Sequence, residues 1–202
     1  MLTLKNRLLL ALSAGLSLAV MSSAALAKQD VLVAYFSLDY LIPKDVDATT
    51  AATKLHMNTS IVAKKIADLT HADIVELKST YDYPAVSYDS TKQLVQQFAK
   101  NNEKPLLQKT DLSFSDYKTV CIGFPVWFHK APSEIESFVK DHANDLKGRQ
   151  VMFFTTSGAT RPDDIIADFA KVLPDSVILP TVSVTLQNMD EDLKALDGLK
   201  LK

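Results

Sequence analysis

The chain has 202 residues, of which 47% are hydrophobic and 23% are charged, and its formal net charge at pH 7 is −2. This length suits one domain with a core of ordinary size, and the mildly acidic balance argues against nucleic acid or an anionic membrane surface as a partner. The single cysteine, Cys121, excludes an internal disulfide, so the core alone must stabilise the fold.

The first 27 residues have the pattern of a secretory signal peptide. Lys5 and Arg7 form a positive n-region, residues 8–23 are apolar, and a small-residue cleavage site ends at Ala27. The apolar segment is short for a membrane span and no stop-transfer pattern follows, so we expect no stable membrane insertion after cleavage. The sequence thus predicts an exported protein, periplasmic or extracellular, with one mature domain over residues 28–202.

The first expected element of that domain is a strand buried on both faces. Residues 31–36 are all apolar or aromatic, and Ser37 ends the run. A long link without clear periodicity follows, and Asn58 is then a good N-cap for a helix expected over residues 58–70. A helix N-terminus presents free backbone N–H groups, so it is a candidate anion site; a plain N-cap with nothing bound is the alternative. The candidate donors are Ser37, Asn58, Thr59 and Ser60.

The rest of the chain alternates between expected strands and helices. Further strands are expected at residues 73–77, 119–124, 151–155 and 177–185. Helices are expected around Leu94, Val95 and Phe98, after a Ser133/Glu136 capping box, over residues 165–173 and in the tail at 190–202. This alternation predicts a doubly wound, five-stranded parallel sheet in the order 2-1-3-4-5, with helices on both faces. Ligands of such a sheet bind beyond the carboxyl ends of the strands where the order reverses, here between the first and third strands.

The loop after the third strand carries a candidate wall for a flat ring. Pro125, Val126, Trp127 and Phe128 follow the buried strand directly. An isoalloxazine ring needs an apolar wall of this kind for stacking, although an ordinary half-buried tryptophan is the alternative. Tyr83, with Tyr81 beside it in sequence, would cover the opposite face of the ring, unless both are half-exposed turn residues.

A hydroxyl-rich loop ends the fourth strand at the same edge of the sheet. Thr156, Ser157 and Gly158 suit backbone contact with a sugar-like chain or with the polar edge of a ring. A nucleophilic serine is disfavoured, because the G-x-S-x-G elbow is missing. The G-x-G-x-x-G and P-loop patterns are also absent, the four histidines lack metal-ligand spacing, and Phe124 stands where a receiver domain needs its aspartate.

Together these motifs resemble the flavodoxin family. The stretches that carry the resemblance are residues 34–37 (AYFS), 58–59 (NT), 123–128 (GFPVWF), 131–132 (AP) and 154–158 (FTTSG). The resemblance implies a flavodoxin fold, noncovalently bound FMN and a redox function. By position it implies the following contacts: Ser37, Asn58 and Thr59 at the phosphate, Pro125, Val126 and Trp127 at the ring, and Thr156, Ser157 and Gly158 near the ribityl chain or the pyrimidine edge.

The chain departs from the family pattern in four places. Residues 38–57 are an insertion, Met57 and His129 replace glycines, and residues 159–161 replace the second half of a glycine-rich loop. Each glycine replacement puts a Cβ where the family has backbone space.

The function expected from these features is that of an exported, FMN-binding electron-transfer protein. Its redox partner would be a protein or a quinone, because an exported chain has little access to NADPH. Two alternatives stay open: an FMN-dependent quinone or nitro-compound reductase, and a binding module of the same fold that has lost FMN.

Overall fold

The fold is that of a computed structural model, and it is described here for residues 30–39, 51–83 and 88–201. The expected signal peptide, residues 1–27, and residues 40–50 of the insertion lie outside these ranges. Within the described part of the chain, no helix combines the length and the apolar character that crossing a membrane requires.

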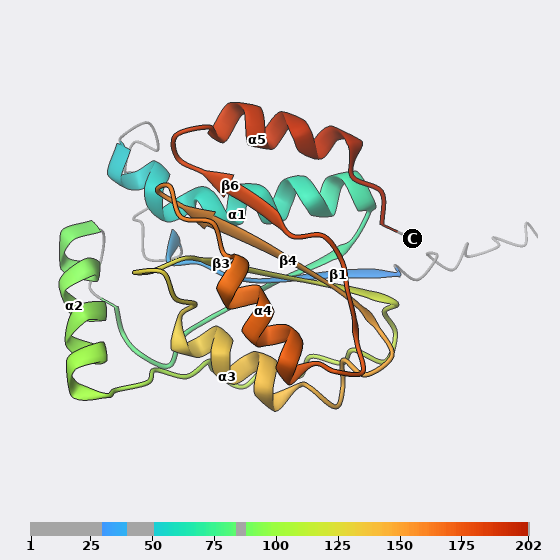
Figure 1. The fold of residues 1–202 in the computed structure, drawn as a ribbon, viewed down its shortest axis with the longest axis horizontal. Coiled ribbons are helices and arrows are strands. Elements are labelled where there is room, and N and C mark those ends of the chain that lie inside the picture. Colours follow the sequence, from blue (N-terminus) through green and yellow to red (C-terminus); the bar gives the residue numbers. More distant parts are fainter. Residues whose placement is uncertain (1–29, 40–50, 84–87, 202) are drawn as a thin grey trace, which may run out of the picture.

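A six-stranded parallel sheet forms the centre of the molecule (Figure 1). Its strands are β1 (Val31–Phe36), β2 (Asp73–Leu77), β3 (Thr119–Pro125), β4 (Gln150–Ser157), β5 (Val177–Ile178) and β6 (Val182–Thr185). The order is β2-β1-β3-β4-β5. β5 pairs with the start of β4, and β6 pairs with the carboxyl end of β4. The doubly wound fold with the order 2-1-3-4-5 is therefore confirmed.

The last strand differs from the expectation, because residues 177–185 form two short strands instead of one. The Leu179 N–H still donates to the Val151 carbonyl, at 2.9 Å. Pairing resumes with β6, and the Leu186 N–H donates to the Ser157 carbonyl at 2.8 Å. Seven residues lie from Leu179 to Leu186 but six from Val151 to Ser157, so one extra residue interrupts the regular pairing between β5 and β6.

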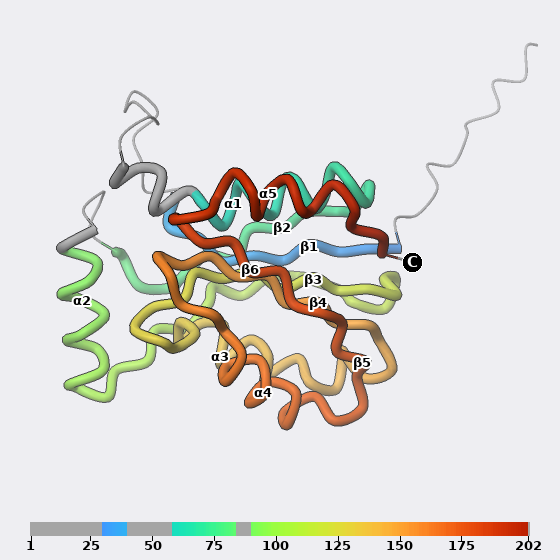
Figure 2. The backbone as a smooth tube through the Cα atoms, turned by 45° about the horizontal axis from the view of Figure 1, so that its top comes forward, coloured from blue at the N-terminus to red at the C-terminus, as the bar shows by residue number. Residues whose placement is uncertain are grey.

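Helices cover both faces of the sheet (Figure 2). On one face lie α1 (Ala51–Thr70) and α5 (Met189–Ala195), and on the other lie α3 (Ser133–Asp141) and α4 (Asp163–Val172). Alternate residues of β1 enter two separate cores: Val33 and Tyr35 face α1 and α5, whereas Leu32 and Phe36 pack in the core that includes α3 and α4. Because both faces of β1 are buried, its sequence is an unbroken run of apolar and aromatic residues.

The second helix takes a different position from the other four. α2 (Tyr88–Asn101) stands at the end of the sheet, beyond the carboxyl ends of the strands, at the left of Figure 1. It covers no face of the sheet. As a result, α2 forms one wall of the region in which a doubly wound sheet binds its ligands.

Two of the expected helix starts are wrong. α1 begins at Ala51, so Asn58 lies within the helix and caps nothing. Residues 51–57 contain no glycine or proline, and helix-forming alanine, lysine and leucine let the helix extend seven residues, or roughly 10 Å, before Asn58. At α3 the Ser133/Glu136 capping box does not form, because Pro132 is the N-cap residue and the Ser133 hydroxyl donates to the Pro105 carbonyl.

Candidate functional site

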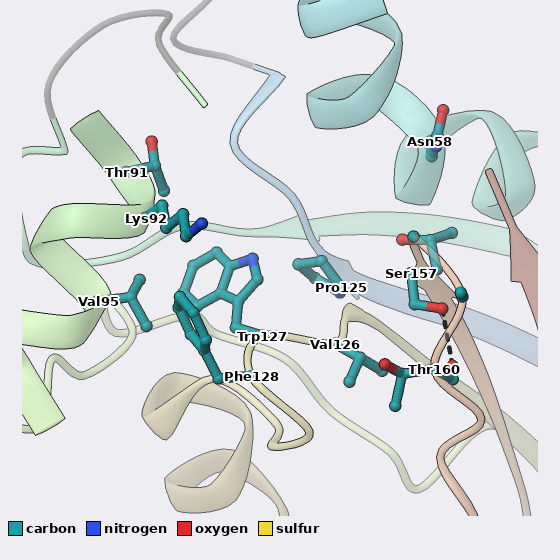
Figure 3. Close-up of a pocket in the computed structure, with 13 residues that line it drawn as sticks. Asn58, Thr91, Lys92, Val95, Pro125, Val126, Trp127, Phe128, Ser157 and Thr160 are labelled. Carbon is teal, nitrogen blue, oxygen red and sulfur yellow. Dashed lines mark hydrogen bonds between the residues drawn. The ribbon is translucent and has the colours of Figure 1, made fainter. Parts of the chain in front are cut away.

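A cavity of about 250 Å³ lies at the carboxyl ends of β3 and β4 (Figure 3). We call it the first cavity. It is lined by α1, by α2, by the end of β3 with the loop after it, and by the end of β4 with the loop after it. Its lining residues are Asn58, Thr91, Lys92, Val95, Pro125, Val126, Trp127, Phe128, Thr156, Ser157, Gly158, Ala159 and Thr160.

The first cavity brings together most of the residues that the sequence predicted at an FMN site. Eight of the twelve line it, namely Asn58, Pro125, Val126, Trp127, Phe128, Thr156, Ser157 and Gly158. The other four, Ser37, Thr59, Ser60 and Tyr83, are buried and are not part of its lining. Segments far apart in sequence meet here because the carboxyl ends of parallel strands share one edge of the sheet.

A hydrogen-bonded hydroxyl pair connects α1 to β4 beneath the cavity. Thr59 Oγ1 and Thr156 Oγ1 are 2.6 Å apart, and both side chains are buried. The next residue, Ser157, donates its hydroxyl proton to the Thr160 carbonyl at 2.7 Å. Figure 3 draws this bond as a dashed line. The first contact holds the end of β4 against the helix, and the second closes the loop that follows β4.

Among the residues that line the first cavity, Asn58 has a buried polar atom without a hydrogen-bond partner. It is 3% exposed, lines the first cavity, and its Oδ1 has no hydrogen-bond partner among the described residues. A buried polar atom left unpaired costs about 1–3 kcal/mol. Because a carboxamide offers both N–H donors and an acceptor, a polar ligand in the cavity would remove this cost.

The apolar wall of the first cavity is a tight hairpin after β3. The backbone N–H of Trp127 donates to the Lys130 carbonyl, and the backbone N–H of Lys130 donates to the Trp127 carbonyl, both at 2.9 Å. The indole ring contacts Phe36 edge-on, with 5.8 Å between centroids. Phe128 is 46% exposed, and Figure 3 shows it beside the indole, facing Val95 of α2.

The two central residues of this hairpin have left-handed backbones. Phe128 has φ 50° and His129 has φ 61°, the pattern of a type I′ turn, which normally uses asparagine, aspartate or glycine. The cost is of order 1–2 kcal/mol for each residue with a Cβ. The hairpin that carries Trp127 therefore keeps a strained turn, which its two backbone hydrogen bonds help to hold in place.

Replacing His129 by glycine should relieve part of that strain. We expect His129→Gly to raise the free energy of unfolding by roughly 0.5–1 kcal/mol, after the greater entropy of the unfolded glycine chain offsets part of the gain. Urea unfolding would measure the change. Lys130→Gly is the matched control, because Lys130 is not among the positive-φ residues and should lose stability. An unchanged or lower stability of His129→Gly would contradict the strain.

Tyr83 lies behind the indole rather than across the cavity from it. It is 2% exposed, its ring centroid is 6.0 Å from that of Trp127, and its hydroxyl donates to Glu134 Oε1 at 2.7 Å. The Ser79 hydroxyl donates to the same oxygen at 2.8 Å. Tyr83 thus packs against Trp127 from outside the first cavity.

Glu134 is a buried carboxyl that the sequence analysis missed. It is 1% exposed, and burial raises its pKa above the ordinary value of 4.5, although hydrogen bonds from Tyr83 and Ser79 act in the opposite direction. The sequence analysis made no prediction for Glu134, and its position beside Ser133 at the start of a helix gives no signal of burial.

The raised pKa of Glu134 predicts a pH dependence of stability. Between pH 4.5 and the raised pKa, the folded protein keeps a proton on Glu134 that the unfolded chain has lost, so the free energy of unfolding falls as pH rises through this window. Glu134→Gln should flatten this slope in urea unfolding measured from about pH 4 to about pH 8. Glu103→Gln, at an exposed position, should keep the wild-type slope, and an equal slope in Glu134→Gln would contradict the assignment.

The residues from α2 are the other part of the site that the sequence analysis missed. Thr91, Lys92 and Val95 face the indole from the opposite wall (Figure 3). Lys92 and Val95 are three residues apart and so share one side of a helix. That spacing was visible, but nothing in the sequence placed this helix at the end of the sheet.

Two other chemistries find little support in the structure. Burial raises the pKa of Cys121 to about 12, so this thiol is an inert part of the core. Among the described residues, no group of three or more His, Cys, Asp and Glu side chains is placed to hold a metal ion.

The residues of the first cavity fit FMN in their chemistry. Trp127, Phe128, Pro125 and Val95 offer apolar surface to a ring, and the unpaired Asn58 carboxamide and the Lys92 ammonium suit a phosphate or polyol chain. The backbone cradle expected at Asn58 is absent, because α1 continues through this residue and its N–H groups serve the helix. Side chains therefore replace backbone amides as the available donors.

Comparison with known proteins places this architecture among the flavodoxins. The family model described as Flavodoxin matches residues 30–196. A search of curated proteins finds no significant match.

Several solved structures share the fold. Candidate flavoproteins from Bacteroides eggerthii and Bacteroides uniformis are 23% and 21% identical to the chain, with TM-scores of 0.60 and 0.59. The alignments cover 86% and 83% of this chain and 99% and 97% of theirs. A flavoprotein from Lactobacillus acidophilus, solved in complex with FMN, is 18% identical with a TM-score of 0.57, over 81% of this chain and 97% of its own. At these identities the likeness shows a shared fold.

Proposed function

The chain belongs to the flavodoxin family, and from this premise we propose that it binds FMN noncovalently in the first cavity and acts as an electron-transfer protein. One observation carries the proposal: eight residues from three separate stretches of sequence, each expected at a flavin, line a single cavity at the carboxyl ends of the strands. One of the similar structures, from Lactobacillus acidophilus, contains FMN.

The proposed roles follow the chemistry of each wall. Trp127 and Phe128 stack against the ring, Pro125 and Val126 contact its edge, and Val95 closes the apolar side from α2. Phe128 is exposed and strained, which suits a group that contacts both the ring and solvent.

The polar end of the cavity would take the phosphate and the ribityl chain. Asn58, Ser157 and Gly158 would contact them directly, and Lys92, which Figure 3 shows on α2 facing the indole, would add positive charge near the ring. Ser37, Thr59 and Ser60 are buried below this end, where Thr59 fixes Thr156 through the 2.6 Å hydroxyl contact. Tyr83 supports the indole from behind.

The flavin supplies the redox chemistry, so no residue of the chain has to act as an acid, a base or a nucleophile. The residues set the affinity and the redox potential through stacking, nearby charge and exclusion of water. We propose that the signal-like segment at residues 1–27 directs export, and that electrons come from a protein or quinone partner rather than from NADPH.

The proposal is tested with FMN and a chain of residues 28–202. After incubation with FMN and removal of free flavin, the protein should be yellow, and FMN fluorescence should be quenched on titration because Trp127 stacks on the ring. Asn58→Leu should weaken FMN binding, whereas Asn101→Leu, at an exposed position on α2, should not. A colourless protein that leaves FMN fluorescence unchanged would overturn the proposal.

A second candidate function is a binding module of this fold that does not hold FMN. The start of α1 at Ala51 favours it, because no helix N-terminus faces the site at Asn58. The same titration separates the two functions, since the colourless outcome selects the binding module.

A further inference from the structure

A second cavity of about 500 Å³ adjoins the first on the other side of the indole. It lies between α2, the hairpin after β3 and the start of α3, and it shares Val95, Trp127 and Phe128 with the first cavity. This volume falls within the range of small-molecule sites. The proposed function does not use it.

Four of the sixteen residues that line the second cavity are aromatic. Tyr83, Phe98, Trp127 and Phe128 all line it, from three different elements. The Tyr83 ring lies 6.1 Å from that of Phe98 and 6.0 Å from that of Trp127, so these rings form one contiguous surface. Aromatic faces carry negative partial charge and attract cations.

The innermost charge of the second cavity is the Glu134 carboxylate. Its hydrogen-bond donors are neutral: the hydroxyls of Tyr83 and Ser79 on Oε1, and its own backbone N–H in the first turn of α3. Ser133 lies 3.4 Å from Oε2, but its single proton is directed to the Pro105 carbonyl at 2.9 Å. Among the described residues no lysine, arginine or histidine pairs with Glu134.

A buried carboxylate without a cation is costly. Burial raises the pKa of Glu134, as expected for a carboxyl that lacks a positive neighbour. Glu136 lines the same cavity with intermediate burial, while Lys104 and Lys130 are exposed at its rim, where water screens their charge. Glu103 is a third acidic residue of the lining and is exposed like the two lysines, so Glu134 is the one fully buried charged group among the lining residues.

We propose that the second cavity binds a small organic cation of the ammonium class, with its charge at Glu134 and its alkyl groups against the aromatic rings. A carboxylate and several ring faces around one apolar space satisfy both parts of such a ligand. A bare metal ion fits poorly, because no group of three potential ligands is present among the described residues. This proposal is independent of FMN, since Glu134 does not line the first cavity.

The test is calorimetric titration of FMN-free protein with choline and with 3,3-dimethylbutan-1-ol, its neutral isostere, at about pH 8, above the ordinary carboxyl range. Choline should bind at least about tenfold more tightly than the isostere. Glu134→Gln keeps a hydrogen-bond acceptor for Tyr83 and Ser79 but removes the charge, and it should lose that preference. Glu191→Gln, at an exposed position on α5 that lines neither cavity, should keep it.

Ala99→Phe provides a test that does not disturb the buried carboxyl. Ala99 is exposed on α2 and lines the second cavity but not the first. Ala159 is exposed and lines the first cavity but not the second. Ala99→Phe should reduce choline binding at least about tenfold while sparing FMN binding, and Ala159→Phe should do the reverse. Equal binding of choline and its isostere, no binding of either, or full choline binding by Ala99→Phe would overturn the proposal, whatever the outcome with FMN.

Discussion

Replacing Gly123 by alanine should destabilise the protein by about 3 kcal/mol, the upper part of the range for overpacking a core. Gly123 lies on β3 in register with Phe154 of β4. A Cβ at this position would stand 2.0 Å from Phe154 Cζ and 2.2 Å from Cε2. Because the Phe154 ring is fully buried in the core under α1, it has little room to move. Urea unfolding of the domain would measure the loss.

Two further variants make this prediction specific. Gly198→Ala is the matched control, since a Cβ there meets no atom within 4 Å and stability should hardly change. Phe154→Leu in the Gly123→Ala background should recover part of the loss, because the smaller side chain frees the space; the two changes should then be clearly non-additive. The close approach of position 123 to the Phe154 ring would be contradicted if the stability losses of the two substitutions were additive, or if Gly123→Ala were as stable as the wild type.

Removing the indole should have the largest effect on flavin binding. Trp127→Ala deletes the stacking wall between the two cavities, and we expect the affinity for FMN to fall about tenfold or more. Trp127→Phe keeps a smaller aromatic face and should lose less. Equilibrium titration of FMN fluorescence would measure both variants.

The control for this prediction is an aromatic residue at the far end of the sheet. Tyr117 is half-buried beside the start of β3, where its hydroxyl donates to Asp73 at 2.8 Å. Tyr117→Ala should leave FMN affinity unchanged. If Trp127→Ala bound FMN as tightly as the wild type while remaining folded by circular dichroism, the indole would have no role at the ring.

The sequence was most informative where one element buries residues on both faces. β1 matches the predicted run of residues 31–36, and β3 extends the predicted 119–124 by one residue. A strand covered by helices on both sides has no polar face, so its apolar run starts and stops with the strand itself.

The sequence was least informative where local signals compete with long-range packing. Asn58 is a good N-cap in isolation, but helix-forming residues precede it and α1 begins at Ala51. Ser133 is likewise a typical capping residue, yet the Pro105 carbonyl lies close enough to accept its proton. Capping patterns describe a preference of a few neighbouring residues, and a distant partner can change the outcome.

For this protein, the order of apolar runs and helical periods by itself determined the doubly wound sheet, and the motif positions determined which strand ends carry the candidate site. Only the tertiary structure decided that α2 stands at the end of the sheet, that Tyr83 supports the indole from behind and that Glu134 is buried beside a second cavity. The physical reason is that a strand buried on both faces is recognisable from its own continuous run of apolar residues, whereas the placement of α2, Tyr83 and Glu134 depends on contacts between segments that are distant in the chain.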